Sequence, residues 1–156
     1  MADSNTAAAA LDSVALARRC AESMYQRDTA TRELGMTLKT VSPGCAVLCM
    51  PVRDDMIQGH GSCHGGFIFA LADSAFAFAC NTYNETTVAS GCSIEYVSPG
   101  LPGDVLTAEA RELTRKGRTG VYDVRVTGGD GQLVALFRGK SYRVRGQVIH
   151  DEESQA

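Results

Sequence analysis

One stretch of the 156-residue chain constrains its fold more than any other: a glycine-rich loop that leads directly into a long apolar segment. Gly and His are too dense between Gly59 and His64 for a stable helix interior, so this part is predicted as loop. The segment from Gly65 to about Asn81 has no polar face, which is typical of a helix that is buried on nearly all sides. One acid, Asp73, lies in its middle.

The position of Asp73 is the first indication of function. A buried charge costs several kcal/mol unless it has a partner, so a carboxylate in an apolar helix needs an explanation. It is either a structural acid paired with a basic residue or a group that takes part in chemistry. The same acid argues against a membrane span, since no basic residue closely flanks the segment and the chain offers no second span.

Length and charge set further limits. A chain of 156 residues fits one domain, and a net charge of -3 with a pI near 5.6 argues against nucleic acid as the main partner. The charge is uneven, because nine basic residues face only three acids between Arg111 and Arg145. This local excess indicates either an anionic ligand or ordinary solvated strand faces. The basic residues are Arg111, Arg115, Lys116, Arg118, Arg125, Arg138, Lys140, Arg143 and Arg145.

The cysteines favour a reducing compartment. The chain has 6 cysteines, none in a C-x-x-C pair, and several lie in apolar runs where a free thiol behaves as a small hydrophobe. The N-terminal segment lacks the basic start of a signal peptide. We therefore expect a cytoplasmic protein without disulfides.

The hydropathy pattern predicts two helical segments before the loop and two groups of strands around the central helix. The alternation of apolar and polar residues and the turn residues between runs set the boundaries. The expected helices are 11–28, a short turn at 29–34 and the central helix, and the expected strands are 36–41, 45–52, 87–97, 104–114, 119–127 and 133–144.

These elements indicate an α+β fold with an N-terminal helix. The strands are joined by turns too short for parallel crossovers, so the sheet should be mostly antiparallel. The one long central helix is then either wrapped by the sheet or shared between the sheet and a second subunit. A single domain at 11–147 is expected, between a disordered tail at 1–10 and a flexible tail at 148–156.

The loop and the acid together suggest a reaction. The N-terminus of a helix presents unpaired N–H groups and a positive dipole end, and Gly65 and Gly66 leave them open to a ligand. A carbonyl oxygen bound there would be polarised, and Asp73 would serve as general base on water or as nucleophile. Gly65 and Asp73 lie eight residues apart, about 12 Å along one helix. One carbonyl meets both only if a second subunit supplies the acid, which predicts at least a dimer.

Three other motifs are weaker. Gly59-x-Gly61 begins like a dinucleotide fingerprint, but position 64 is His and βαβ alternation is missing. His60, Cys63 and His64 lack the further ligands of a complete metal shell, so we expect no metal site. Cys63 as a nucleophile would need a His facing it in space, which adjacency to His64 does not provide.

The central motif of the sequence resembles that of a known family. The motif H-G-G-x-x-x-x-L-A-D at His64 to Asp73 is similar to that of the hotdog-fold acyl-CoA thioesterases, specifically the PaaI type. The stretches T-G-V-Y-D-V at 119–124 and A-L-F-R-G-K-S at 135–141 resemble the same branch. The likeness covers about residues 19–146. It implies a hotdog fold, a dimer of dimers, and hydrolysis of phenylacetyl-CoA or hydroxyphenylacetyl-CoA.

The resemblance also implies roles for individual residues. Asp73 matches the catalytic acid, Gly65 the residue whose amide polarises the thioester carbonyl, and His64 the histidine that helps to orient the site. Ser93 matches a strand position that carries a hydroxyl close to the attacking water. The residues that match the basic positions near the CoA phosphates are Arg115, Lys116 and Arg118.

One residue departs from the family pattern. Six residues before His64 the family usually has Asn, which also contacts the carbonyl, and here the residue is Gln58, whose amide donates the same bond from a chain one methylene longer. No cofactor is implied, because CoA is part of the substrate. Two rivals remain: a CoA-ester-binding module without turnover, and a structural hotdog partner within a larger complex.

Overall fold

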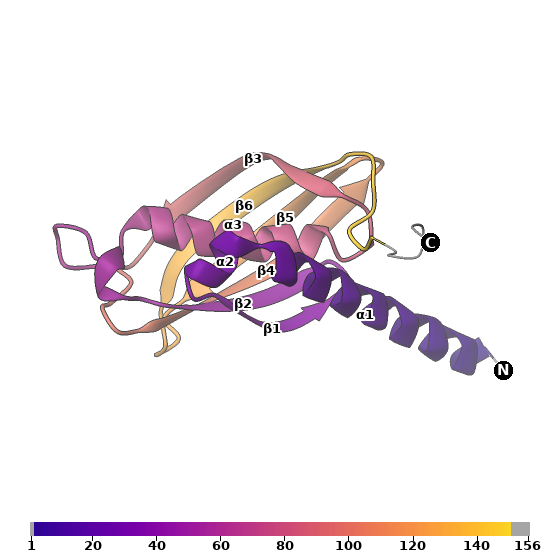
Figure 1. The fold of residues 1–156 in the computed structure, drawn as a ribbon, viewed down its shortest axis with the longest axis horizontal. Coiled ribbons are helices and arrows are strands. Elements are labelled where there is room, and N and C mark those ends of the chain that lie inside the picture. Colours follow the sequence, from indigo (N-terminus) through magenta and orange to yellow (C-terminus); the bar gives the residue numbers. More distant parts are fainter. Residues whose placement is uncertain (1, 151–156) are drawn as a thin grey trace, which may run out of the picture.

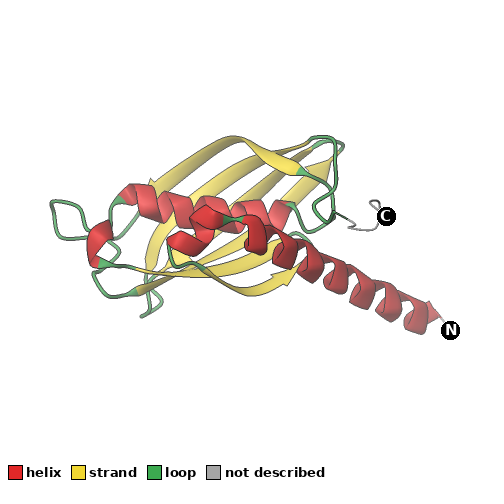
Figure 2. Ribbon diagram, viewed as in Figure 1, coloured by secondary structure: helices red, strands yellow, loops and turns green. Residues whose placement is uncertain are grey.

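The computed structural model describes residues 2–150 and has one curved antiparallel sheet with a long helix across its concave face (Figure 1, Figure 2). The helices are α1 (Ala2–Arg27), α2 (Thr29–Glu33) and α3 (Gly65–Cys80), with a short 3-10 turn at Asp54–Met56. The strands are β1 (Thr37–Ser42), β2 (Cys45–Pro51), β3 (Thr87–Tyr96), β4 (Val105–Lys116), β5 (Thr119–Thr127) and β6 (Leu133–Arg143). This architecture confirms the predicted α+β fold.

The 6-stranded sheet has the order β1-β2-β4-β5-β6-β3, and every neighbouring pair is antiparallel. Strand β3 follows α3 in the chain and returns to the edge beside β6, opposite to the edge formed by β1. The first strand after α3 in the chain is therefore an edge strand of the sheet that α3 packs against.

Aromatic side chains fix α3 against the sheet. Phe76 packs on Tyr122 of β5 and Phe137 of β6, with ring centroids 5.5 and 5.9 Å away. Phe69 makes a second, edge-on contact with Phe137. Tyr122 is fully buried, and its hydroxyl donates to Glu112 Oε2 at 2.7 Å, so its polar end is satisfied inside the core.

The C-terminal end of α3 is tied to the start of β3. The Asn81 side chain donates to the Ala77 and Thr87 carbonyls and accepts from the Thr87 N–H, each at 2.9 Å. Because all these groups belong to a helix end and a strand start, the bonds fix the position of one relative to the other. The Asn81 side chain thus joins the last turn of α3 directly to the first residue of β3.

One face of α3 is less covered than the sequence suggested. Phe67, Ala70, Asp73, Ser74 and Ala77 are only partly buried, because the sheet covers one side of the helix. Of the elements before it, α2 reaches this face through a 3.3 Å contact between the Thr31 and Ser74 hydroxyls. The expectation of burial on nearly all sides is wrong for this single chain.

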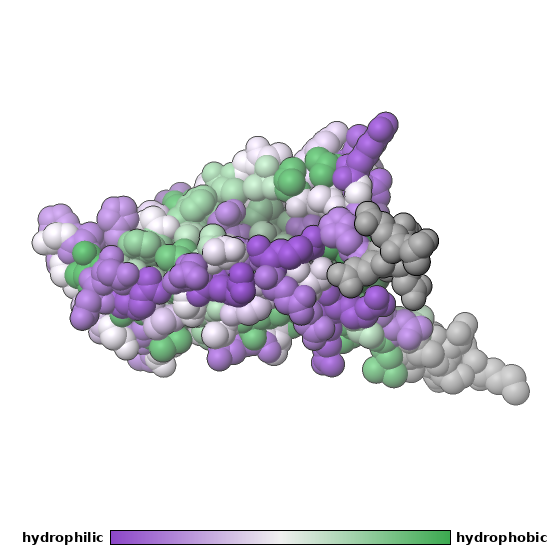
Figure 3. Space-filling view, viewed as in Figure 1, coloured by the Kyte–Doolittle hydropathy of each residue, from purple (hydrophilic) through white to green (hydrophobic). Residues whose placement is uncertain are grey.

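Strand β3 is an exposed edge. Most of its residues are exposed on both faces, including Val88 and Tyr96 at 46% and 52%. Figure 3 shows apolar surface in the region between α3 and this edge. A 10-residue edge strand that is paired on one side and has open N–H and C=O groups on the other is a template for pairing with another chain.

The two ends of the chain differ from the sequence-based expectation. Helix α1 begins at Ala2, within the segment expected to be a disordered tail, and projects beyond the sheet (Figure 1). The four alanines at 7–10 explain this, because Ala has the highest helix propensity. At the other end Val148 is buried and its N–H donates to Asn84 Oδ1, so the segment expected to be flexible is held at 148–149. Residues 151–156 of that segment, like Met1, lie outside the described residues.

Within the described chain, no helix combines the length and hydropathy needed to cross a membrane.

The contact between Gly139 and Phe76 gives a test of the packing. A Cβ at Gly139 would lie 2.8 Å from three ring atoms of Phe76, which is closer than side chains pack. We expect Gly139→Ala to lower the free energy of unfolding by about 1–3 kcal/mol, measured by urea denaturation. Gly59→Ala is the control, because nothing lies within 4 Å of its Cβ position. Equal stability of the two variants would contradict this account of the core.

Candidate functional site

The loop before α3 is closed on itself and pinned to the sheet end. The Gln58 N–H donates to the Ser62 carbonyl and the Gly61 N–H to the Gln58 carbonyl, both at 2.9 Å. The Cys63 N–H bonds the Gly100 carbonyl at 2.9 Å and the His64 N–H bonds the Met56 carbonyl at 2.8 Å. The loop therefore delivers His64 to the helix start at a fixed position.

His64 caps the helix and leaves one amide free. Its Nδ1 accepts from the Gly66 N–H at 2.9 Å, which places the ring proton on Nε2. Its carbonyl accepts from the N–H groups of Phe67 and Ile68 at 3.0 and 3.5 Å. Among the described residues no acceptor bonds the Gly65 N–H. The cap thus selects Gly65 as the amide available to a ligand.

Tyr96 of β3 covers the first residue of the helix. Its hydroxyl donates to the Gly65 carbonyl at 2.9 Å, and a Cβ on Gly65 would lie 3.0 Å from Tyr96 Cζ. The ring approaches this closely only because position 65 has no side chain. Glycine is therefore required here by its neighbour in the sheet.

Two cavities open on either side of this helix start. One, of about 390 Å³, is lined by Ser62, Cys63, Gly65, Ile68, Tyr96 and the 97–99 segment. The other, of about 500 Å³, is mostly apolar and is lined by Leu34, His64, Gly66, Phe67 and Ala70. The free amide of Gly65 thus belongs to a hollow that can hold a small molecule.

Asp73 lies two turns further along the helix, half-buried beside β3. Its Oδ1 accepts a weak bond from the Cys92 thiol at 3.8 Å. Burial raises the pKa of Asp73 above its ordinary 3.8, and the bond from Cys92 acts in the opposite direction. No basic side chain within the described residues forms an ion pair with it. Residues 2–150 thus give no support to the alternative that Asp73 is a structural acid with a basic partner.

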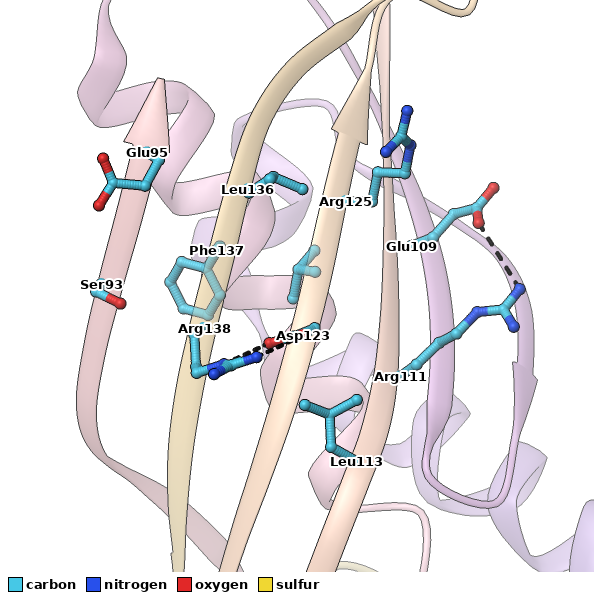
Figure 4. Close-up of a pocket in the computed structure, with 11 residues that line it drawn as sticks. Ser93, Glu95, Glu109, Arg111, Leu113, Asp123, Arg125, Leu136, Phe137 and Arg138 are labelled. Carbon is cyan, nitrogen blue, oxygen red and sulfur yellow. Dashed lines mark hydrogen bonds and ion pairs between the residues drawn. The ribbon is translucent and has the colours of Figure 1, made fainter. Parts of the chain in front are cut away.

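Ser93 is not brought to Asp73. Successive residues of a strand point to opposite faces, so Cys92 faces the helix while Ser93 lies on the outer face of the sheet. There it lines a shallow cavity of about 540 Å³ with Glu95 and with Arg138, which pairs with Asp123 (Figure 4). The sequence reasoning missed Cys92, although the alternation along β3 carries the signal once Tyr96 is known to face the helix.

Gln58 is engaged within its own loop. Its Oε1 accepts from the His60 N–H at 2.6 Å, and its Nε2 donates to Ser62 Oγ at 2.8 Å. Ser62, rather than Gln58, lines the cavity at Gly65. The sequence does not single out Ser62, because a loop sequence does not show which of its side chains faces a cavity.

The basic residues are at the far end of α3. Arg115 donates to Glu85 at 2.9 Å and its guanidinium lies 3.8 Å from the centre of the Tyr83 ring, so its charge is already compensated. Lys116 and Arg118 are exposed in the β4–β5 turn and form no ion pair among the described residues. This turn lies beside the start of β3, whereas Gly65 lies beside its end.

Comparisons with known proteins show the family of the chain. The profile of the Thioesterase superfamily matches residues 60–135, which include the helix start, α3 and the first strands after it. The acyl-coenzyme A thioesterase PaaI of Escherichia coli is 44% identical over 128 residues, covering 82% of this chain and 91% of the relative. The chain belongs to the PaaI-type thioesterases.

Solved structures lead to the same family. The structure of E. coli PaaI from the phenylacetic acid degradation operon superposes with a TM-score of 0.85 at 43% identity, covering 86% of this chain and 97% of that one. A Streptococcus mutans protein bound to acetyl-CoA superposes with a TM-score of 0.68 at 27% identity, covering 72% and 90%. The resemblance noted in the sequence and the assignment to thioester hydrolases are therefore confirmed.

The raised pKa of Asp73 predicts the pH dependence of stability in this thioesterase. Ionising a half-buried acid destabilises the fold, so stability falls as the pH rises from 3.8 through the higher pKa of the folded state. We expect Asp73→Asn to unfold at higher urea concentration than the wild type near neutral pH. This advantage should vanish below the ordinary pKa, where the wild-type acid is protonated in both states.

Asp123→Asn is the control with the opposite sign. The Arg138 guanidinium lowers the pKa of Asp123, so this acid contributes stability above its ordinary pKa and loses it as the pH falls. Both side chains are about half exposed, so the loss near neutral pH should be small. If Asp73→Asn were the less stable variant near neutral pH, the view of Asp73 as an uncompensated acid would be wrong.

Proposed function

We propose that this PaaI-type thioesterase hydrolyses the CoA thioesters of arylacetic acids, phenylacetyl-CoA or hydroxyphenylacetyl-CoA, to the free acid and CoA. The observation that carries the proposal is the unpaired Gly65 N–H in a hollow at the positive end of α3, combined with an uncompensated acid on the same helix. The first is a site for a developing oxyanion, and the second is a base with no structural partner.

The reaction proceeds by addition and elimination. The thioester carbonyl oxygen accepts the Gly65 N–H, and a water molecule whose proton passes to Asp73 adds to the carbonyl carbon. The tetrahedral intermediate then expels the CoA sulfur, which takes up the proton held by Asp73 and so returns the carboxylate to its starting form. Burial makes Asp73 a stronger base than an exposed carboxylate, because it raises the pKa of the group. Direct attack by the carboxylate is the alternative route, through an anhydride that water hydrolyses.

The site belongs to two subunits in this proposal. Gly65 and Asp73 are separated by eight residues of one helix, about 12 Å, so a single chain does not present both to one carbonyl. The exposed edge β3 runs beside the same helix and is free to pair with a copy of itself. An antiparallel β3–β3 pair about a twofold axis places the two α3 helices side by side in opposite directions.

Two contacts define where that axis must pass. The helix and the strand run antiparallel, with Tyr96 at the level of Gly65 and Cys92 at the level of Asp73. Asp73 of the partner subunit reaches the level of Gly65 only if the axis lies midway, near Ile94. In that register Cys92 stands opposite Tyr96 of the partner subunit.

The same symmetry supports a role for the basic turn. The β4–β5 turn with Lys116 and Arg118 lies at the end of the sheet away from Gly65, and the twofold axis carries the partner's turn to the Gly65 end. We propose that Lys116 and Arg118 bind the phosphates of CoA in this way. Arg115 has less to offer a ligand, since Glu85 already pairs with it.

The preference for an aryl group rests on Phe67 and on the relatives. Phe76 and Phe78 are core residues, whereas Phe67 lines the apolar hollow of about 500 Å³ beside His64. The E. coli relative comes from the phenylacetic acid degradation operon, which fits an aryl acyl group. The S. mutans relative binds acetyl-CoA, which fits the CoA half of the substrate.

Hydrolysis of phenylacetyl-CoA, acetyl-CoA and a long-chain acyl-CoA tests the function. We expect turnover of the aryl ester, measured by the free thiol that each turnover releases. Asp73→Asn should lower the rate of hydrolysis by at least about 100-fold. Glu22→Gln, a change at an exposed acid of α1, is the control and should keep the wild-type rate. A wild type that cleaves none of the esters would favour the non-catalytic CoA-ester-binding module. A single turnover in labelled water distinguishes the routes, because label enters the Asp73 carboxylate only after direct attack.

A cysteine pair tests the shared site. In the proposed register, Tyr96→Cys places a thiol opposite the native Cys92 of the partner subunit, so mild oxidation should give a covalent dimer on a non-reducing gel. The wild type should give none, since its two Cys92 residues would be about 13 Å apart along the strands. Tyr96→Cys in a Cys92→Ser background is the control. A monomeric protein, or a Cys92–Cys92 disulfide in the wild type, would refute the register.

A further inference from the structure

We propose that Ser62 is a catalytic residue whose hydroxyl donates the second hydrogen bond to the thioester carbonyl, beside the Gly65 N–H, and that Gln58 acts only through Ser62. This inference rests on the proposed hydrolysis and adds a group to its site. It replaces the expectation that the Gln58 amide itself contacts the carbonyl.

The orientation of the Gln58 amide is fixed by a backbone donor. The His60 N–H can only donate, so the atom 2.6 Å from it must be the amide oxygen Oε1. The amide nitrogen Nε2 is then directed to Ser62 Oγ, 2.8 Å away. The assignment of oxygen and nitrogen follows from chemistry here, because the reverse placement would put two donors together.

This orientation leaves the Ser62 hydroxyl proton unassigned. Nε2 can only donate, so Ser62 Oγ is the acceptor in their bond and its own proton points elsewhere. Within residues 2–150 no acceptor takes that proton. A partly buried hydroxyl that accepts one hydrogen bond and donates none can donate to a ligand.

Ser62 and Gly65 share one hollow. Both line the cavity of about 390 Å³, together with Ile68 and the Tyr96 ring. The cavity thus contains two donors with no acceptor among the described residues, one from the backbone and one from a side chain. A carbonyl oxygen has two lone pairs and can accept both bonds.

The chemistry of the step is unchanged by this addition. When water adds to the carbonyl carbon and the C=O π electrons move to oxygen, the Gly65 N–H and the Ser62 O–H both stabilise the negative charge. Neither proton is transferred, and the charge returns to form the carbonyl as the C–S bond breaks. The bond that Ser62 accepts from Gln58 polarises its hydroxyl and strengthens it as a donor.

Gln58 is a positioning residue in this account. Its longer side chain spans the loop between the His60 N–H and Ser62 Oγ, and both ends of its amide are used there. Removing the amide frees Ser62 to rotate but leaves its hydroxyl in the cavity. Its effect on turnover should therefore depend on the presence of Ser62.

The experiment measures kcat and KM for phenylacetyl-CoA in single and double variants, with thermal unfolding as a fold check. Ser62→Ala should lower kcat by about 100–1000-fold with a much smaller change in KM. Ser62→Thr and Ser62→Val form a matched pair of nearly equal shape, and only the threonine should retain most of the wild-type kcat. This pair separates the hydroxyl from the packing even if alanine disturbs the loop.

The double variant tests the route from Gln58 to the substrate. Gln58→Leu should lower kcat in the wild type but have little further effect in the Ser62→Ala background. An equal loss in both backgrounds would show that Gln58 contacts the carbonyl itself and would overturn the inference. Equal kcat values for the threonine and valine variants would overturn it as well. Both results leave hydrolysis by the wild type intact, whereas a wild type without turnover refutes the proposed function and this inference together.

Discussion

The N-terminus of α3 is held by three contacts that together determine which backbone group a ligand meets. His64 accepts the Gly66 N–H, the His64 carbonyl accepts the next amides, and Tyr96 holds the Gly65 carbonyl from the sheet. The first two satisfy the N–H groups of Gly66, Phe67 and Ile68, so among the described residues the Gly65 N–H is the one amide of the first turn left without an acceptor. The placement of both cavities, and the need for glycine at position 65, follow from the same arrangement.

Asp73 has an unusual position for an acid. An ionised carboxylate that is half-buried and bonded only to a thiol lacks the compensation that structural acids such as Asp123 and Glu85 have in this protein. Folding tolerates the cost because α3 makes aromatic contacts on its other side. An acid without such compensation is a candidate for a functional role, because perturbed acids gather at functional sites.

Most of the fold could be predicted from the sequence, because strands and turns are encoded locally. The alternation along 119–127 and the glycines at 128–131 define β5 and its turn without reference to the rest of the chain. The helical state of residues 2–10 does not follow from the hydropathy pattern, because a short alanine run next to small polar residues has no apolar face. Nothing in the local pattern showed that one face of α3 would remain partly open.

The candidate site was predictable only in part. His64, Gly65 and Asp73 belong to one motif, so their positions along the helix could be predicted from the sequence. Ser93 and Cys92 differ by a single position, and in a strand that difference decides which face of the sheet a side chain occupies. The bulge between Ala89 and Gly91 shifts the register of β3 with β6, and the sequence pattern did not predict it. The bonds of Gln58 depend on the loop conformation, which is encoded even less directly.

The attachment of α3 to β3 at both ends has a geometric consequence. Tyr96 holds the first residue of the helix and Asn81 holds the last turn, so the helix cannot slide along the strand without breaking these bonds. In the proposed twofold pair, the eight-residue interval from Gly65 to Asp73 would set the offset between the two proposed sites. A single residue inserted into this interval would turn Asp73 by about 100° around the helix and would displace the acid of both centres at once. In the proposed pair, the length of α3 between these two residues would therefore fix the spacing of both sites.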